Sequence, residues 1–191
     1  MARLPYPDPK DLSPENRDLM ASLPPLNVFR MMSGAGASFA PFMQFISAYL
    51  NEGVLDPELR ELVILRVGHL CGSAYEVHQH ERVSRTLGIS EARIQAVKDK
   101  LPNDLLSDAE NAALLFADEQ VAQVKVSDTT FTATHTHLTD PQVVELTIIV
   151  GTYLMVCRFL ETLEIELEET DIDGSGLEEI EASVKSLNGG E

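Results

Sequence analysis

The side chains best suited to chemistry lie within one short stretch of the sequence. Ser73, Glu76 and His80 stand at positions i, i+3 and i+7, so on a helix they project from one face. The carboxylate of Glu76 can orient the imidazole of His80 and raise its pKa, which gives a titratable group near neutral pH. This spacing predicts a row of proton-handling side chains. The alternative interpretation is a surface Glu–His pair that contributes only a few tenths of a kcal/mol to stability.

The two cysteines, Cys71 and Cys157, do not form a recognisable redox motif. They are too few and too far apart in the sequence for a disulfide framework or a CxxC pair. A reducing compartment is the natural expectation for such a chain. Cys71 has no partner at CxxC spacing, so we interpret it as a small buried or half-buried side chain.

The histidine spacing predicts no metal site. His78 and His80, like His135 and His137, are two residues apart, and on a helix such positions point roughly 200° away from each other. Helical zinc sites use i and i+4 instead. Residues 171–176 resemble the start of a calcium loop, but the glutamate that should close this loop is absent.

Helices must position these side chains, because helix signals recur along the chain. A capping residue comes just before a proline at Ser13, Asp56 and Asp140, which indicates three helix starts. Apolar residues then recur at three- and four-residue spacing. Two predicted helices are placed by their starts, at residues 13 and 90. The others cover residues 26–32, 39–50, 57–70, 73–87, 107–121, 128–138 and 142–163.

Two of these helices are expected to begin with capping boxes, at Ser73 with Glu76 and at Ser107 with Glu110. The threonine-rich residues 128–138 suit a helix or a strand, because β-branched side chains favour strands, and we predict a helix. No segment alternates as a half-buried strand does. The predicted fold is therefore all-α.

Composition and charge limit the possible partners. Hydrophobic residues make up 44% of the chain, which is enough for a sizeable core, and the net charge is −17. A surface with this much negative charge repels phosphate backbones and anionic lipids. We therefore expect neither nucleic acid nor a membrane as a partner. We predict an extended arm over residues 1–13, a helical domain over 14–165 and an acidic tail over 166–191. This tail is either simply solvated or a recruiting site for a basic partner.

The sequence also predicts where the protein is and how it assembles. The apolar run at 146–160 is interrupted by polar residues and too short to span a bilayer, and the N-terminus lacks the apolar segment of a secretory signal. We expect a soluble cytoplasmic protein. The helices at 39–50 and 142–163 are apolar over more than one face, which favours their burial between subunits of a homo-oligomer.

Three sequence segments together resemble one known family. They are Leu59-Arg60-Glu61-Leu62-Val63-Ile64-Leu65-Arg66, Ser73-Ala74-Tyr75-Glu76-Val77-His78-Gln79-His80 and Leu87-Gly88-Ile89-Ser90. This pattern resembles the carboxymuconolactone decarboxylase family, also called AhpD-like, and the likeness spans about residues 26–165. The resemblance implies an AhpD-like helical domain that assembles as a dimer, trimer or hexamer.

The peroxidase branch of this family uses a CxxC pair before a histidine, with a glutamate on the previous helix relaying protons. That pattern places the glutamate at Glu61, the two cysteines at Ser73 and Glu76, and the histidine at His80. Both reactive sulfurs are therefore missing, and a hydroxyl or a carboxylate cannot replace a thiolate. A peroxide-linked reductase is accordingly the weaker alternative.

The decarboxylase branch is the better match. In that branch a lactone acid loses CO2 and the resulting dienolate is protonated on carbon, with no cofactor. The resemblance implies that His80 is the acid and that Glu76 and Glu61 orient it.

Other residues of the pattern would serve this reaction or only the fold. Tyr75 could donate a hydrogen bond or only pack. Arg60 or Arg66 could hold the carboxylate of a small anionic substrate, or make structural ion pairs. Leu154 stands where the family often has a polar residue, which is a departure from the pattern. A non-catalytic helical oligomer that binds a ligand is the remaining alternative.

Overall fold

The chain forms two compact units in a computed structural model that describes residues 1–168. Among the described residues, one unit contains 1–53 and 163–168, and the other contains 54–162. These boundaries differ from the predicted division into 1–13, 14–165 and 166–191. Most of the predicted acidic tail, and the calcium-like residues 171–176, lie outside the described residues.

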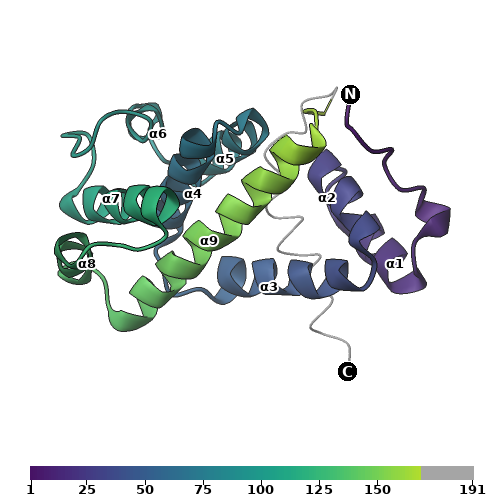
Figure 1. The fold of residues 1–191 in the computed structure, drawn as a ribbon, viewed down its shortest axis with the longest axis horizontal. Helices are drawn as coiled ribbons and strands as arrows, with labels where there is room; N and C mark the ends of the chain where they lie inside the picture. The colour runs from purple at the N-terminus through teal and green to yellow at the C-terminus, as the bar shows by residue number, and fades with distance from the viewer. Residues whose placement is uncertain (169–191) are drawn as a thin grey trace. The chain divides into compact units, whose positions relative to one another are not determined.

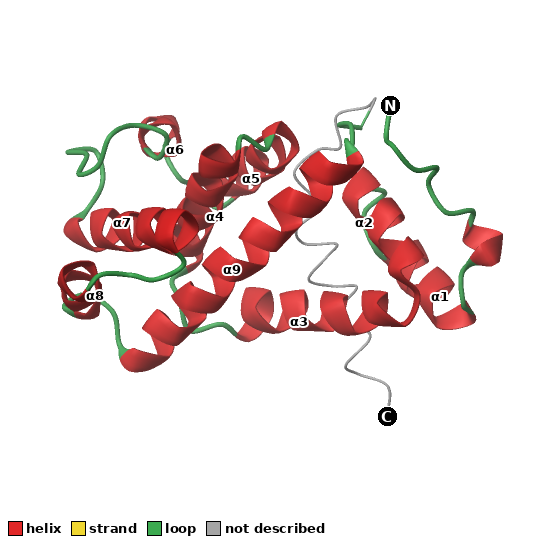
Figure 2. Ribbon diagram, in the orientation of Figure 1, coloured by secondary structure: helices red, strands yellow, loops and turns green. Residues whose placement is uncertain are grey.

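The prediction of an all-α fold is confirmed for the described residues. They form helices joined by loops, and no strand occurs among them (Figure 2). The threonine-rich segment forms helix α8, Asp128–His135, capped by the side chain of Ser127. Its one fully buried threonine, Thr134, donates its hydroxyl to the carbonyls of Ala112 and Thr130, so hydrogen bonds accommodate this polar side chain inside the helix.

The first unit consists of three α-helices and two short 3-10 helices. They are η1 Pro9–Asp11, α1 Pro14–Ser22, α2 Asn27–Met32, η2 Ser33–Ser38 and α3 Phe39–Glu52. The predicted arm is attached to this unit, because the backbone N–H of Arg3 donates to the carbonyl of Leu163 over 2.9 Å and its guanidinium pairs with Glu164. Within the unit, α3 packs against α1.

The second unit contains the residues of the predicted site. Its helices are α4 Pro57–Cys71, α5 Ala74–Thr86, α6 Glu91–Ala96, α7 Asp108–Gln123, α8 and α9 Asp140–Leu163, whose last residue belongs to the first unit. Figure 1 shows α4 beside both α5 and α7, against which it packs. Residues 62–65 of α4 are 0% exposed. The buried stretch runs without a break over residues 59–68, so α4 is covered on all sides and is the central helix of this unit.

The ends of α4 follow directly from its sequence. The side chain of Asp56 accepts hydrogen bonds from the backbone N–H groups of Glu58 and Leu59, and Pro57 occupies the first turn. The helix ends at Gly72, whose φ of 66° is the left-handed conformation that glycine adopts without strain. A Cβ at Gly68 would lie 3.1 Å from Cγ2 of Val77, so this glycine permits the close approach of α4 and α5.

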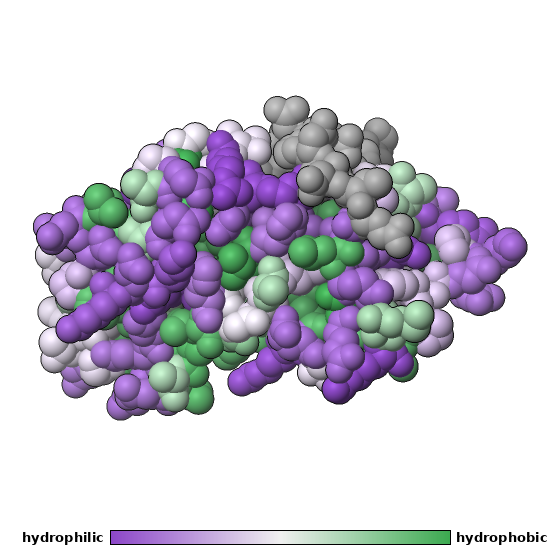
Figure 3. Space-filling view, turned by 90° about the horizontal axis from the view of Figure 1, so that it is seen from above, coloured by the Kyte–Doolittle hydropathy of each residue, from purple (hydrophilic) through white to green (hydrophobic). Residues whose placement is uncertain are grey.

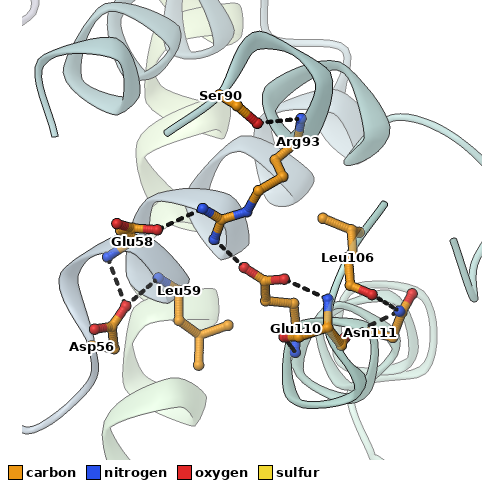
Figure 4. Close-up of polar contacts among 9 residues, drawn as sticks. Asp56, Glu58, Leu59, Ser90, Arg93, Leu106, Glu110 and Asn111 are labelled. Carbon is orange, nitrogen blue, oxygen red and sulfur yellow. Dashed lines mark hydrogen bonds and ion pairs between the residues drawn. The ribbon is translucent and has the colours of Figure 1, made fainter. Parts of the chain in front are cut away.

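An ion-pair network joins three helices of the same unit. The guanidinium of Arg93 on α6 donates to Glu58 on α4 over 2.6 Å and also to Glu110 on α7 (Figure 4). Glu110 in turn completes the capping box with Ser107, as predicted for the start of α7. One arginine therefore connects the first turns of α4 and α7 to α6.

The capping box predicted at Ser73 is wrong. Ser73 does occupy the N-cap of α5, but its side chain makes no capping hydrogen bond. The reason is that both side chains of the predicted box are used inside the unit. Ser73 is 0% exposed, and the carboxylate of Glu76 lies against His80 instead of the N-cap backbone.

Helix α9 is longer than the apolar run that the sequence suggested. By length and composition alone, α9 could cross a membrane. The sequence predicted that the apolar run at 146–160 is too short for this. A core helix of a soluble protein passes the same test, and α9 has a buried side that includes Leu146, Ile149 and Leu160. On the face shown in Figure 3, hydrophilic residues predominate, with smaller hydrophobic patches between them.

Candidate active site

The site is built around Glu61, a carboxylate in the middle of the most buried helix. Its side chain is 0% exposed, and the next four positions of α4, residues 62–65, are apolar and equally buried. A charged group in such surroundings is stable only when it is paired. Two partners are present, the imidazole of His80 and the guanidinium of Arg60, whose Nε lies 3.4 Å from Oε1 of Glu61.

His80 lies between two carboxylates. Its Nδ1 is 2.6 Å from Oε2 of Glu61 on α4, and its Nε2 is 3.1 Å from Oε1 of Glu76, one turn earlier on α5. The side chain of Glu76 is 5% exposed and that of His80 is 14% exposed. The Glu76–His80 contact predicted from the spacing is present, and its burial excludes the alternative of a surface pair.

These contacts keep His80 protonated. Burial alone would lower its pKa, but the negative charges of Glu61 and Glu76, together with the hydrogen bonds to both, raise the pKa of His80 to about 10. Both ring nitrogens then carry protons: Nδ1 donates to Glu61, and Nε2 forms an ion-pair contact with Glu76. The site holds an imidazolium at neutral pH, which is the protonation state that a proton donor needs.

Tyr153 of α9 completes the surroundings of His80 and was not predicted as a site residue. The two rings meet edge to face, with centroids 5.0 Å apart and an angle of 89° between their planes. Tyr153 lies within the α9 stretch that carries the family resemblance, and this was the one available signal for it. Tyr75, which was predicted, is 4% exposed and lies next to Glu76 in the first turn of α5.

The two arginines predicted to bind substrate occupy different surroundings. Arg60 is buried beside Glu61 and so belongs to the site. Arg66 donates from Nε and Nη2 to the carboxylate of Asp118 on α7, at 2.6 and 2.7 Å. Its Nη1 donates to the carbonyls of Val97 and Asp99. This is the structural ion-pair role that the sequence left open for Arg66.

The thiols of Cys71 and Cys157 lie near each other and near this site. Cys71, at the end of α4, and Cys157, on α9, each influence the pKa of the other thiol, and neither forms a disulfide. The Ser73 hydroxyl, which is buried and hydrogen-bonds to no described group, lowers the pKa of Cys157. Cys71 is half-buried, as interpreted from the sequence, and the other cysteine stands 86 residues later (157 − 71).

Among residues 1–168, no group of three or more histidine, cysteine, aspartate or glutamate side chains is arranged to hold a metal ion. His80 already contacts a carboxylate through each ring nitrogen. His135, predicted not to pair with His137 at a metal, has its Nε2 2.6 Å from Asp140. What the cluster can do is store and transfer one proton, because an imidazolium can release the proton of one ring nitrogen and take up another.

The comparisons with known proteins agree with this architecture. Residues 37–119 match the model of the carboxymuconolactone decarboxylase family. No match is found among curated proteins.

Solved structures with the same fold include three relatives of low sequence identity. A peroxidase-related protein from Ralstonia eutropha JMP134, described as an alkylhydroperoxidase AhpD core, is 21% identical with a TM-score of 0.76, over 88% of this chain and 93% of its own. A putative antioxidant defence protein AhpD from Agrobacterium tumefaciens is 21% identical with a TM-score of 0.65, over 72% of this chain and 96% of its own. The debrominase Bmp8 is 16% identical with a TM-score of 0.70, over 92% of this chain and 96% of its own. Residues 37–119 of this chain are thus similar to the carboxymuconolactone decarboxylase family, and its described helices have the AhpD-like fold.

Proposed function

We propose that this protein is a cofactor-independent lyase that decarboxylates a small lactone acid or oxo acid, with His80 as the proton donor. The observation that carries the proposal is the position of His80 between Glu61 and Glu76, which keeps a buried imidazolium ready at neutral pH. The match of residues 37–119 to the model of the carboxymuconolactone decarboxylase family supports the same reaction class.

The chemistry requires a single proton. The bond between the substrate and its carboxylate breaks, CO2 leaves, and the electron pair remains on the conjugated lactone as a dienolate. A dienolate carbon is a strong base, so an imidazolium with a pKa of about 10 can protonate it. The C–H bond forms as the N–H bond of His80 breaks, and the two carboxylates then draw a new proton from solvent onto the neutral imidazole.

The cluster can accept an anionic substrate because Arg60 offsets its negative charge. Two carboxylates and one imidazolium sum to −1, which would repel a substrate carboxylate. The buried guanidinium of Arg60, adjacent to Glu61, offsets this charge. In this proposal Arg60 makes the site electrostatically neutral, while Arg66 serves the fold and Tyr75 and Ser73 shape the first turn of α5.

Product analysis in D2O tests the proposal. The purified protein is incubated with a panel of lactone acids and oxo acids, CO2 is measured, and the products are examined for deuterium. We expect CO2 release and one deuterium at a single carbon of the former dienolate. Ligand-induced stabilisation without turnover would favour the non-catalytic ligand-binding alternative.

The peroxide-linked alternative is tested separately. It is favoured by the likeness to peroxidase-related proteins and opposed by the absence of sulfur at Ser73 and Glu76. Peroxide consumption with a dithiol donor, at a rate above that of the Cys71→Ser variant, would support this alternative over the lyase.

We also propose that the chain assembles as a homo-oligomer. Val144, Ile148 and Met155 lie along one side of α9, and each is more than 40% exposed. An apolar row at this spacing is typical of a helix that packs against another subunit. Sedimentation equilibrium at micromolar concentration should give a mass above that of the monomer, and Ile148→Glu should lower it. A wild-type monomer at this concentration would contradict the proposal.

A further inference from the structure

Tyr153 contacts the imidazole of His80 from α9, a third helix beside α4 and α5. The centroids of the two rings are 5.0 Å apart, and their planes make an angle of 89°. This distance and this angle are typical of a favourable edge-to-face pair of rings. Tyr153 is 5% exposed, so its ring is enclosed by other side chains and has little room to move away.

The two carboxylates hold the nitrogen atoms of His80 rather than the rotation of its ring. Nδ1 donates to Glu61 over 2.6 Å, and Nε2 makes a 3.1 Å ion-pair contact with Glu76. Both contacts act in the plane of the imidazole, because its N–H bonds lie in that plane. The torsion about the Cβ–Cγ bond of a histidine has broad minima, so the ring resists rotation only weakly by itself. The perpendicular ring of Tyr153 limits this rotation on the side of α9.

We propose that Tyr153 is a positioning residue, whose aromatic ring keeps the imidazole of His80 in the orientation from which it gives its proton to the substrate. Proton transfer requires the donor atom within hydrogen-bond reach of its target. A displacement of about 1 Å can lower a rate by about 100-fold. The role in catalysis rests on the lyase activity proposed above, whereas the contact between the two rings does not depend on it.

Positioning differs from charge tuning in what a substitution changes. The charged groups beside His80 are Glu61 and Glu76, with Arg60 next to Glu61, and all of them remain when Tyr153 is replaced by leucine. The pKa of His80 should therefore stay raised above its ordinary value in Tyr153→Leu. The orientation of the ring should change, and with it kcat, while KM and the pH dependence of the rate stay close to those of the wild type.

NMR of the full chain with isotope-labelled histidine tests the ring contact without any substrate. The resonances of His80 are identified by their absence from the spectrum of His80→Asn. In the wild type, the carbon-bound ring protons of His80 should show a ring-current shift from Tyr153, and its Nδ1–H should exchange slowly with water. Tyr153→Leu should abolish this shift and speed the exchange by about 10-fold. Tyr153→Phe keeps the ring and should preserve both signals.

The matched control is Phe116→Leu, because Phe116 on α7 is 3% exposed and its replacement also removes a buried ring from the second unit. This variant should lower the Tm, as Tyr153→Leu does, but leave the His80 resonances unchanged. Circular dichroism checks the fold of each variant. Unchanged His80 resonances in folded Tyr153→Leu would overturn the proposal. If Tyr153→Leu does not fold, the wild-type spectrum decides, because His80 protons without a ring-current shift would also overturn it.

Kinetics then test whether the contact serves catalysis. On the lactone acid or oxo acid of the panel that the wild type decarboxylates, Tyr153→Leu should lower kcat by about 10-fold with KM nearly unchanged. Tyr153→Phe should retain the wild-type kcat. Equal kcat values for the wild type and Tyr153→Leu would overturn the positioning role. The absence of CO2 release from every compound would refute the lyase instead, and the NMR result would still decide whether Tyr153 holds His80 in place.

Discussion

Nδ1 of His80 lies 2.6 Å from Oε2 of Glu61, and the side chain of Glu61 is 0% exposed. This short contact joins α4 to α5 through opposite charges from which water is excluded. If either partner loses its charge, the other loses its shortest ion pair in a buried position, which is costly. The proton of His80 is therefore tied both to the stability of the α4–α5 pair and to any chemistry at the site.

Replacing His80 with alanine should abolish most of the proton transfer. We expect His80→Ala to lower the rate of CO2 release by about 100-fold, which is the usual scale for losing a positioned acid. His78→Ala is the matched control, because it removes a second imidazole from the same helix, two residues away. Circular dichroism shows whether both variants fold. Wild-type rates in a folded His80→Ala protein would remove His80 from the mechanism.

Replacing Glu76 with glutamine should shift the pH profile. Glu76 raises the pKa of His80, so Glu76→Gln lowers this pKa while preserving the shape of the side chain. A general acid loses activity as the pH rises through its pKa, so the alkaline limb of kcat/KM should move to lower pH. Glu81→Gln is the control, since Glu81 pairs with Arg85 on the outer part of α5. Identical profiles for Glu76→Gln and the wild type would mean that the carboxylate does not tune His80.

The stability of the protein should depend on alkaline pH through His80. Its pKa is about 10 in the folded state and about 6.5 in the unfolded chain. A group whose pKa is raised on folding stabilises the native state fully below the unfolded value, and this stabilisation is lost as the pH rises through the folded value.

Thermal unfolding across this range measures the effect. The difference in Tm between the wild type and His80→Asn should be largest below about pH 6.5 and should shrink toward pH 10. Taking the difference removes the contribution of other groups that titrate in the same range. A difference that is constant with pH would show that His80 does not bind an extra proton in the folded state.

Arg66 should matter for stability more than any surface arginine. Its side chain is 10% exposed, and its removal leaves the carboxylate of Asp118 and two carbonyls without their donor. We expect Arg66→Ala to lower the free energy of unfolding by about 3 kcal/mol, at the low end for a broken buried pair because Asp118 is partly solvated.

The control is Arg85→Ala, because Arg85 is 45% exposed and its ion pairs with Glu81 and Glu91 lie at the surface. This variant should cost less than about 1 kcal/mol in urea denaturation. Equal losses for the two variants would contradict the structural role of Arg66.

Local signals predicted most of the helices correctly. Helix starts depend on a few neighbouring residues, which is why Asp56 with Pro57 and the Ser107–Glu110 capping box were readable from the sequence. The same rule failed at Ser73, because a capping box competes with tertiary contacts. At this position the buried contacts of Ser73 and Glu76 replaced the cap.

The contacts of the site likewise divide into those set by local spacing and those set by helix packing. The Glu76–His80 contact follows from their i, i+4 spacing on one helix, so the sequence alone determined it. Glu61 lies on another helix, and it was the family resemblance, not the spacing, that suggested its role. That Glu61 reaches Nδ1 of His80 depends on how closely α4 and α5 pack, which Gly68 permits.

The sequence by itself determined the helical class, the helix starts and the pairing of neighbours one turn apart, because these depend on interactions within a few residues. Only the tertiary structure decided that Tyr153 lies against His80, that Arg66 belongs to Asp118, and that Cys157 lies near Cys71. Each of these contacts joins residues far apart in the chain. Their meeting depends on the packing of several helices at once, and no local pattern encodes it.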